Sequence, residues 1–288
     1  MIIDVHTHPV CKDLTPLPDP NTLVSKMFGE RATTEKSKMV INGFLFLHEN
    51  QTLQDFVNSF TSAGVDKAVI VPMDMTTSYG TQLGTNEDIA RMVDKAPDKL
   101  IGFSSVDPRR EDATKILEHA ITELNLKGLK LVPPLQKFDP SEERYNPLWE
   151  KALDLNIPVW THTGHQVSVP TSVAKYGHPM LIDEVAMRYP DLTIIMGHLA
   201  APWFWEAWSV VLRRDNVYLD VSVWHTLYPY FPWSAFTDNG IEHKLLFATD
   251  FPFTSFEVGI QAVKNLPISD DFKRKILGEN AQKLLNIK

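Results

Sequence analysis

The sequence predicts a single (β/α)8 barrel, a ring of eight parallel strands surrounded by helices, over 288 residues. Eight short, nearly continuous apolar runs recur along the chain, each bounded by Gly, Pro or Asp, which is typical of parallel strands buried on both faces. After the first run they begin about 24 to 35 residues apart, enough for one strand, one helix and two loops. A doubly wound open sheet is the main alternative, but no Gly-x-Gly-x-x-Gly follows any of the runs.

The expected elements follow one another in alternation along this one domain. The strands are expected at 2–5, 67–71, 100–104, 129–132, 158–161, 193–196, 217–220 and 245–248. The clearest helical periodicity lies at 111–125, 146–156, 178–189 and 270–285, where Asp112, Asn146 and Asp271 suit N-terminal caps or first turns. The first gap is the only long one, and its segment 9–63 leaves the carboxyl end of the first strand. We therefore expect this segment to cover the mouth of the barrel, as a lid or as a subunit contact.

Composition excludes several classes of protein. Lys and Arg number 28 against 36 Asp and Glu, a formal net charge of −8, and no basic block is present. This balance argues against binding to nucleic acid or to an anionic membrane surface, both of which need clustered positive charge. The one cysteine, Cys11, cannot form an intramolecular disulfide, and the chain has no signal-peptide pattern or apolar stretch of membrane-spanning length. The expectation is a cytoplasmic protein that acts on a small molecule.

Four histidines and one aspartate fall at the carboxyl ends of expected strands. His6 and His8 close the first strand two residues apart, so they share one face with their Cα atoms about 6.6 Å apart. His162, His198 and Asp250 end or follow three later strands, and a closed barrel brings all five side chains to its mouth. A His-x-His pair alone also fits ordinary hydrogen-bonded histidines, but the further histidine and the aspartate are more specific. Imidazole and carboxylate ligands suit zinc or another first-row divalent ion.

These motifs, with others spread over almost the whole chain, resemble the amidohydrolase superfamily, in the amidohydrolase-2 branch that includes aminocarboxymuconate semialdehyde decarboxylase and related metal-dependent hydrolases. The strongest matches are Asp-Val-His-Thr-His at 4–8, Ile-Pro-Val-Trp-Thr-His-Thr-Gly at 157–164, Tyr-Pro-Asp-Leu-Thr-Ile-Ile-Met-Gly-His at 189–198 and Phe-Ala-Thr-Asp-Phe-Pro at 247–252. Ala200 and Ala248 depart from the pattern of the branch, where glycine is usual. This difference cautions against adopting the substrate of any one relative.

The resemblance implies that His6, His8, His162 and Asp250 hold one divalent metal ion, usually zinc, with manganese as the other choice. His198 would act beside the metal as an acid/base or by polarising the substrate, although a role as fifth ligand stays open. The chemistry is consistent with this arrangement, since a metal lowers the pKa of bound water from 15.7 to roughly 7. Asp250 could then orient that water and take its proton.

Four further residues are candidates for binding the substrate, and each has a structural alternative. His165 follows His162 in the same loop and either contacts substrate or is a solvated histidine. Arg109 follows the third strand and either clamps a carboxylate or faces solvent. Trp224 belongs to an aromatic-rich region that lines either the pocket or a subunit interface. Lys130 on the fourth strand could contact substrate, become carboxylated and bridge two metals as in another branch of the superfamily, or lie in the barrel interior beside a carboxylate.

The expected function is hydrolysis of a small organic acid, lactone or related carbonyl compound by metal-activated water. Within enzymes, the alternative is a non-oxidative decarboxylase in which His198 or Asp250 protonates the ring carbon after CO₂ leaves. The length of the chain, shorter than is usual for the decarboxylating relatives, favours hydrolysis slightly. A metal-binding scaffold or sensor is the non-enzyme alternative, but such a site has no need of His198. We expect a homodimer.

Overall fold

The computed structural model describes residues 1–13, 26–27 and 35–287, and its parallel strands occur at all eight expected places. The expected third strand is divided at Phe103 into two short pieces, β5 and β6. The strands are β1 (Ile3–Thr7), β2 (Lys67–Ile70), β5 (Leu100–Gly102), β6 (Ser104–Ser105), β7 (Leu129–Leu131), β8 (Val159–Thr161), β9 (Ile194–Met196), β10 (Val217–Asp220) and β11 (Leu245–Leu246).

The strands close into one barrel. They form two parallel groups, β1-β2-β5 and β11-β10-β9-β8-β7-β6. At Phe103 the chain passes from one group to the other, because the Phe103 amide donates to Ile70 O at 3.0 Å and the Ser104 amide to Gly128 O at 2.7 Å. The other seam closes where the Val5 amide donates to Phe247 O at 3.0 Å. The predicted (β/α)8 barrel is therefore confirmed.

Successive strand residues contribute to two separate apolar clusters, as expected for strands buried on both faces. In β2, Ala68 and Ile70 pack in the large cluster that includes the surrounding helices. Val69 instead joins a smaller cluster with Trp160 and Ile195. Both faces of the sheet are thus apolar, which explains why the strand sequences read as continuous hydrophobic runs.

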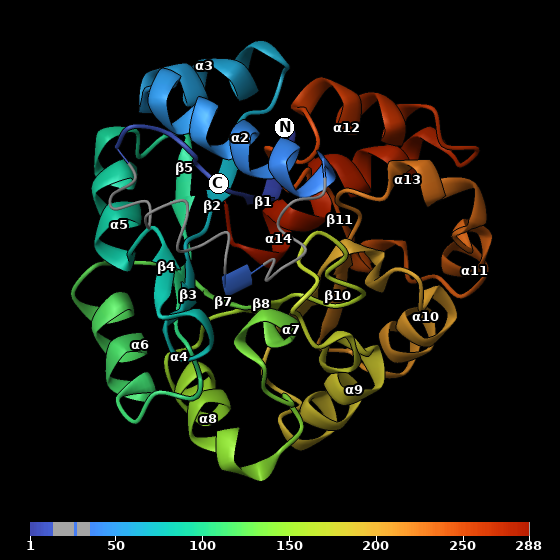
Figure 1. Ribbon diagram of the computed structural model, residues 1–288. Coiled ribbons are helices and arrows are strands. Elements are labelled where there is room, and N and C mark those ends of the chain that lie inside the picture. Colours follow the sequence, from blue (N-terminus) through green and yellow to red (C-terminus); the bar gives the residue numbers. More distant parts are fainter. Residues whose placement is uncertain (14–25, 28–34, 288) are drawn as a thin grey trace.

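The helices form a ring outside the strands (Figure 1). They are α3 (Leu53–Ser62), α5 (Asn86–Lys95), α6 (Ala113–Thr122), α8 (Asn146–Asp154), α9 (Pro179–Arg188), α10 (Phe204–Arg213), α11 (Trp233–Asp238), α12 (Phe256–Lys264), α13 (Asp270–Arg274) and α14 (Asn280–Leu284). The last expected helix is divided into α13 and α14 by a π-helical turn at Lys275–Glu279. Asp112 occupies the N-cap position of α6 without a capping hydrogen bond, and Asp271 lies in the first turn of α13.

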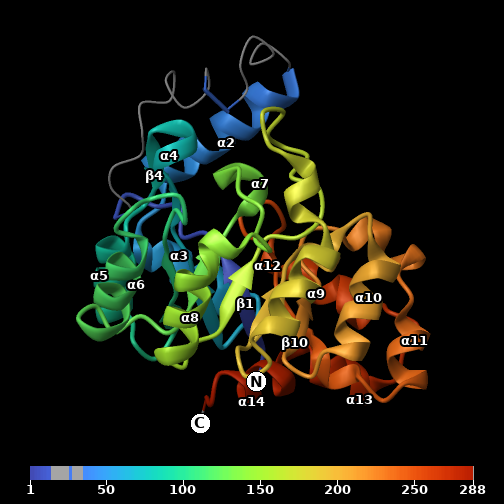
Figure 2. The same cartoon turned by 90° about the horizontal axis from the view of Figure 1, so that it is seen from below.

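Several short elements surround the carboxyl ends of the strands. A hairpin of β3 (Met73–Met75) and β4 (Thr81–Leu83), joined by α4 (Thr76–Tyr79), was not expected from the sequence, and neither was α7 (Pro133–Gln136). Figure 2 shows α2 (Glu35–Asn50), α4 and α7 at the end of the barrel opposite the two chain termini.

The long segment after β1 is described only in part, because 14–25 and 28–34 lie outside the described residues. Its helix α2 contacts a mouth loop through the rings of Phe44 and Phe253, whose centroids are 5.5 Å apart. Its role as a lid stays a prediction. Among the helices of the described residues, none is long and apolar enough to cross a membrane.

Candidate metal centre and active site

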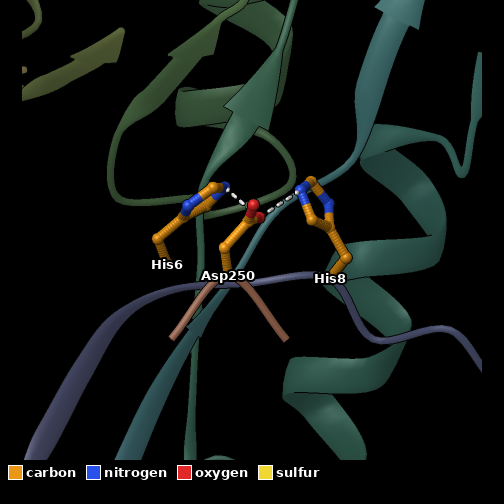
Figure 3. A group of neighbouring side chains, drawn as sticks. All are labelled: His6, His8 and Asp250. Atoms are coloured by element: carbon orange, nitrogen blue, oxygen red, sulfur yellow. Dashed lines mark ion pairs between the residues drawn. The ribbon is translucent and has the colours of Figure 1, made fainter. Parts of the chain in front are cut away.

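Three predicted ligands, His6, His8 and Asp250, meet at the seam between β1 and β11. One ligand atom from each lies within 4.8 Å of the other two, and all three residues are buried. Asp250 Oδ1 is 3.5 Å from His6 Nε2 and 3.3 Å from His8 Nε2, and Figure 3 shows the carboxylate between the two imidazoles. The alternation expected for His6 and His8 thus brings both rings to one place, with centroids 5.0 Å apart.

Backbone hydrogen bonds and Asp4 fix this arrangement. The Asp250 amide donates to His6 O at 2.9 Å, so the two ligands lie on directly paired segments. Asp4 Oδ1 accepts from the His6 amide at 3.1 Å, and Asp4 Oδ2 accepts from Thr249 Oγ1 at 2.6 Å. Burial raises the pKa of Asp4 to about 8. Asp4 therefore connects the ligand His6 to Thr249, the residue before the ligand Asp250, across the seam.

The side chains of this site have ligand atoms that suit a divalent metal ion. Within the described part of the chain, buried His162 Nε2 and Asp250 Oδ1 have no hydrogen-bond partner. A buried polar atom without a partner carries a desolvation cost of about 1 to 3 kcal/mol, which a bound ligand can offset. Imidazole nitrogens and a carboxylate are suitable ligands for Zn²⁺, Mn²⁺ and similar ions.

His162 and His198 lie beside the three-residue cluster. Their ring centroids are 4.5 Å apart, and His198 is 5.3 Å from the ring of His6. His162 is not among the residues whose ligand atoms lie within 4.8 Å of one another. Burial, with a smaller effect from the charge of Lys130, lowers the pKa of His162 to about 3, so its imidazole is neutral, the form that binds metals.

Lys130 lies in the barrel interior against the site. Its Nζ is 2.6 Å from His6 Nε2 and 3.1 Å from the centroid of the Trp160 ring. Burial lowers the pKa of this amine well below its usual value, while the charges of Asp250 and Asp220 oppose the shift. The lysine contacts an imidazole and an indole directly.

Sequence reasoning missed a hydrogen-bond network behind His198. Asp220 is fully buried and accepts from Trp160 Nε1 at 2.6 Å, from the His198 amide at 2.8 Å and from both the amide and the hydroxyl of Ser222, at 3.0 and 2.6 Å. Ser222 Oγ also lies 2.8 Å from His198 Nδ1. The signal in the sequence is Asp-Val-Ser at the end of an expected strand, with the same two-residue spacing as His6 and His8.

A small cavity of about 70 Å³ opens beside these residues. Two of the four substrate-binding candidates, His165 and Trp224, line it, whereas Lys130 lies deeper. Arg109 is exposed, outside the cavity, with Nη1 3.4 Å from Ser78 Oγ. The full lining is His162, His165, Gln166, Val167, Ser168, His198, Val223, Trp224, Asp250 and Phe253.

Comparison with known proteins agrees with this architecture. The sequence profile of a family described as Amidohydrolase matches residues 3–287. The chain belongs to the amidohydrolase family. The resemblance expected from the sequence is thereby confirmed, and so is the prediction of an enzyme.

The relatives include decarboxylases and a hydrolase. A gamma-resorcylate decarboxylase from Polaromonas sp. is 25% identical over 267 residues, covering 76% of this chain and 80% of the relative. The solved dihydroxybenzoic acid decarboxylase from Polaromonas sp. JS666, with bound manganese and the inhibitor 2-nitroresorcinol, has a TM-score of 0.70 at 19% identity and covers 99% of this chain and 97% of its own. A probable 2-pyrone-4,6-dicarboxylic acid hydrolase from Acinetobacter baumannii has a TM-score of 0.65 at 16% identity over 99% of each chain.

The chain is thus an amidohydrolase-family enzyme with a site for a divalent metal ion. For hydrolysis, the support is coarser: the family match and one probable hydrolase among the similar structures. Decarboxylases recur among them, so the alternative stated from the sequence has better support than the hydrolase expectation.

Proposed function

We propose that the protein is a metal-dependent decarboxylase that removes CO₂ from a small aromatic carboxylic acid. The observation that carries the proposal is the sequence relation to gamma-resorcylate decarboxylase over most of both chains. The site has the parts that such a reaction needs, because a buried cluster for a divalent ion lies next to a histidine and an apolar-walled cavity. Chain length, which favoured hydrolysis, is weaker support than this relation.

In this proposal His6, His8 and Asp250 hold the ion, and His162 completes the set of ligands. When bound, the ion supplies Lewis-acid polarisation of substrate oxygens. Zinc and manganese both suit this mixture of imidazole and carboxylate, and zinc remains the expectation from the sequence. Lys130 Nζ lies 2.6 Å from His6 Nε2, so it must leave that nitrogen when an ion binds there.

The cavity walls fit a flat substrate. Trp224, Phe253 and Val223 provide aromatic and apolar surface, and Gln166 and Ser168 provide polar groups. The cavity of about 70 Å³ is smaller than the usual 300 to 1,000 Å³ of ligand sites, so we expect the mouth side chains to move when a benzoate-sized substrate binds. We expect this movement in Phe253 and Val167, which are exposed by 43% and 54%, and Phe253 would then separate from Phe44.

In the reaction, the bond between the ring carbon and the carboxylate breaks and its electron pair stays on the ring carbon. CO₂ leaves, and the ring carbon takes one proton. His198 or Asp250 supplies that proton, since both line the cavity.

The test incubates the purified protein, loaded with Zn²⁺ or Mn²⁺, with hydroxybenzoic acids that carry a ¹³C-labelled carboxylate. We expect release of ¹³CO₂ and, in D₂O, one deuterium on the product ring. Hydrolysis is checked in parallel with 2-pyrone-4,6-dicarboxylate in H₂¹⁸O. If ¹⁸O enters the product of the pyrone and no acid releases CO₂, the protein is a hydrolase and the proposal is wrong.

Metal analysis tests the site separately. We expect about one ion per chain and a loss of that ion in His6→Ala, His162→Ala and Asp250→Ala variants that remain folded by circular dichroism. About two ions per chain would instead favour a Lys130 carbamate that bridges them. The absence of bound metal after reconstitution would overturn the mechanism.

A further inference from the structure

The network of Asp220, Ser222 and His198 fixes the direction of each hydrogen bond. Asp220 Oδ1 accepts two backbone amides, those of His198 and Ser222, and Oδ2 accepts the indole N–H of Trp160. Both carboxylate oxygens therefore act as acceptors. The single hydrogen of the Ser222 hydroxyl points to Oδ1, at 2.6 Å.

The direction of the bond from Ser222 to Asp220 determines the direction of the bond between Ser222 and His198. Since the Ser222 hydrogen is committed to Asp220, Ser222 Oγ has only lone pairs to offer His198 Nδ1, which lies 2.8 Å away. His198 Nδ1 must then carry a hydrogen and donate it to Ser222 Oγ. A neutral imidazole has only one N–H group, so His198 Nε2 is unprotonated.

We propose that Ser222 and Asp220 are positioning residues that hold His198 in the Nδ1–H tautomer and present its unprotonated Nε2 to the candidate active site. The same carboxylate also holds the His198 backbone amide, at 2.8 Å, so it orients both the main chain and the ring. The backbone here needs such support, because His198, Leu199 and Ala200 all have φ between 51° and 61°. Asp220, Ser222 and His198 are buried, and no bulk water competes for these bonds.

The tautomer determines which atom can exchange a proton with the substrate. Nε2 takes up one proton from water in the open cavity before the substrate binds, and the resulting imidazolium transfers that proton to the ring carbon from which CO₂ has left, while Nδ1–H stays bonded to Ser222. If the enzyme hydrolyses its substrate, Nε2 takes the proton of the attacking water. The catalytic consequence rests on the proposed function, but the tautomer itself does not.

Nuclear magnetic resonance tests the tautomer without any substrate. The full-length protein is labelled with ¹⁵N-histidine and loaded with Zn²⁺, which is diamagnetic, and the signals of His198 are assigned by their loss in His198→Gln. We expect the ¹⁵N shifts of a protonated Nδ1 and an unprotonated Nε2. An Nε2–H tautomer in the wild-type protein would overturn the proposal.

Variants of Ser222 test its effect on turnover. Ser222→Ala should lower kcat by about 10- to 100-fold with KM changed less than about twofold, because substrate contacts remain while the ring loses its orientation. Its His198 ¹⁵N signals should show a mixture of tautomers. Ser222→Thr keeps the hydroxyl and should restore both the single tautomer and most of kcat.

Ser104→Ala is the matched control. Ser104 in β6 is equally buried, and its hydroxyl donates to Gly128 O, just before β7, at 2.9 Å. Its loss should leave the His198 signals unchanged. A Ser222→Ala variant with one unchanged tautomer and full kcat would refute the positioning role, whereas absence of decarboxylation in the wild type with the expected tautomer would refute only the proposed function.

Discussion

Strained backbone residues gather at the strand ends that form the site. Asp250 has φ 57° and Val223 has φ 64°, and a β-branched residue in this left-handed region is especially unfavourable. Ala200, with φ 51°, occupies a position where the branch resembled by this sequence usually has glycine, so backbone conformation explains that preference. Such strain persists only where neighbouring contacts impose it, and here the hydrogen bonds of Asp250 to His6 and of His198 to Asp220 do so.

Gly197→Ala should damage the site by overpacking. A Cβ at Gly197 would lie 2.3 Å from Trp160 Cζ2, and Trp160 is fully buried and donates to Asp220. The indole must therefore shift, and we expect a loss of about 1 to 3 kcal/mol in the free energy of unfolding together with weakened support of His198. Urea denaturation measures the loss. Gly43→Ala in α2 is the control, because nothing lies within 4 Å of its added Cβ, and an equal loss there would contradict the argument.

At the scale of elements, the sequence predicts what depends on local pattern. All eight strand positions are predictable because each strand is a continuous apolar run between turn residues. The hairpin at 73–83 is not, because its strands, Met-Asp-Met and Thr-Gln-Leu, form no continuous apolar run. The expected helix 270–285 is interrupted by the π-helical turn at Lys275–Glu279, where Gly278 packs so closely that an added Cβ would lie 2.1 Å from Met1 O.

The same distinction holds within the site. His6 and His8 are predictable as a pair because two-residue spacing in one strand places them together. The role of Asp220 is not, because its partners are Trp160 in β8 and His198 just after β9, 60 and 22 residues away. Arg109 follows a strand as expected, yet its side chain lies against Ser78 and Gln136, and side-chain direction beyond a strand end is set by such loop contacts.

A partly buried ion pair holds the end of α10 to α9. Arg214 Nε is 2.7 Å from Asp183 Oδ1, and Arg214 Nη2 is 3.1 Å from Oδ2, with the side chains only 16% and 9% exposed. Arg214→Ala should lower the free energy of unfolding by about 1.5 to 3 kcal/mol, because it leaves the Asp183 carboxylate with only the exposed Arg213, whose Nη1 is 3.5 Å away. Thermal unfolding followed by circular dichroism measures the change. Arg213→Ala is the control, since Arg213 is 54% exposed and should contribute less than about 1 kcal/mol.

For the whole molecule, the candidate metal centre coincides with the seam of the barrel. His6 and His8 come from the first strand, and Asp250 follows the last, so one ion would join the two ends of the closed sheet. Asp4 and Thr249 already make a hydrogen bond across the same seam. Binding at the seam is therefore coupled to the stability of the complete fold.

Metal binding should consequently raise the melting temperature. An ion that binds only the folded protein, at a free concentration 100 times its Kd, stabilises the fold by about 2.7 kcal/mol, which corresponds to a rise of roughly 5 to 10 °C for a domain of this size. Differential scanning calorimetry after chelation, and again after addition of Zn²⁺ or Mn²⁺, measures the rise. His6→Ala and Asp250→Ala should abolish it, whereas His119→Ala, on the exposed surface of α6, should keep it. If the rise survives in both site variants, the ion binds elsewhere and the seam is not the metal centre.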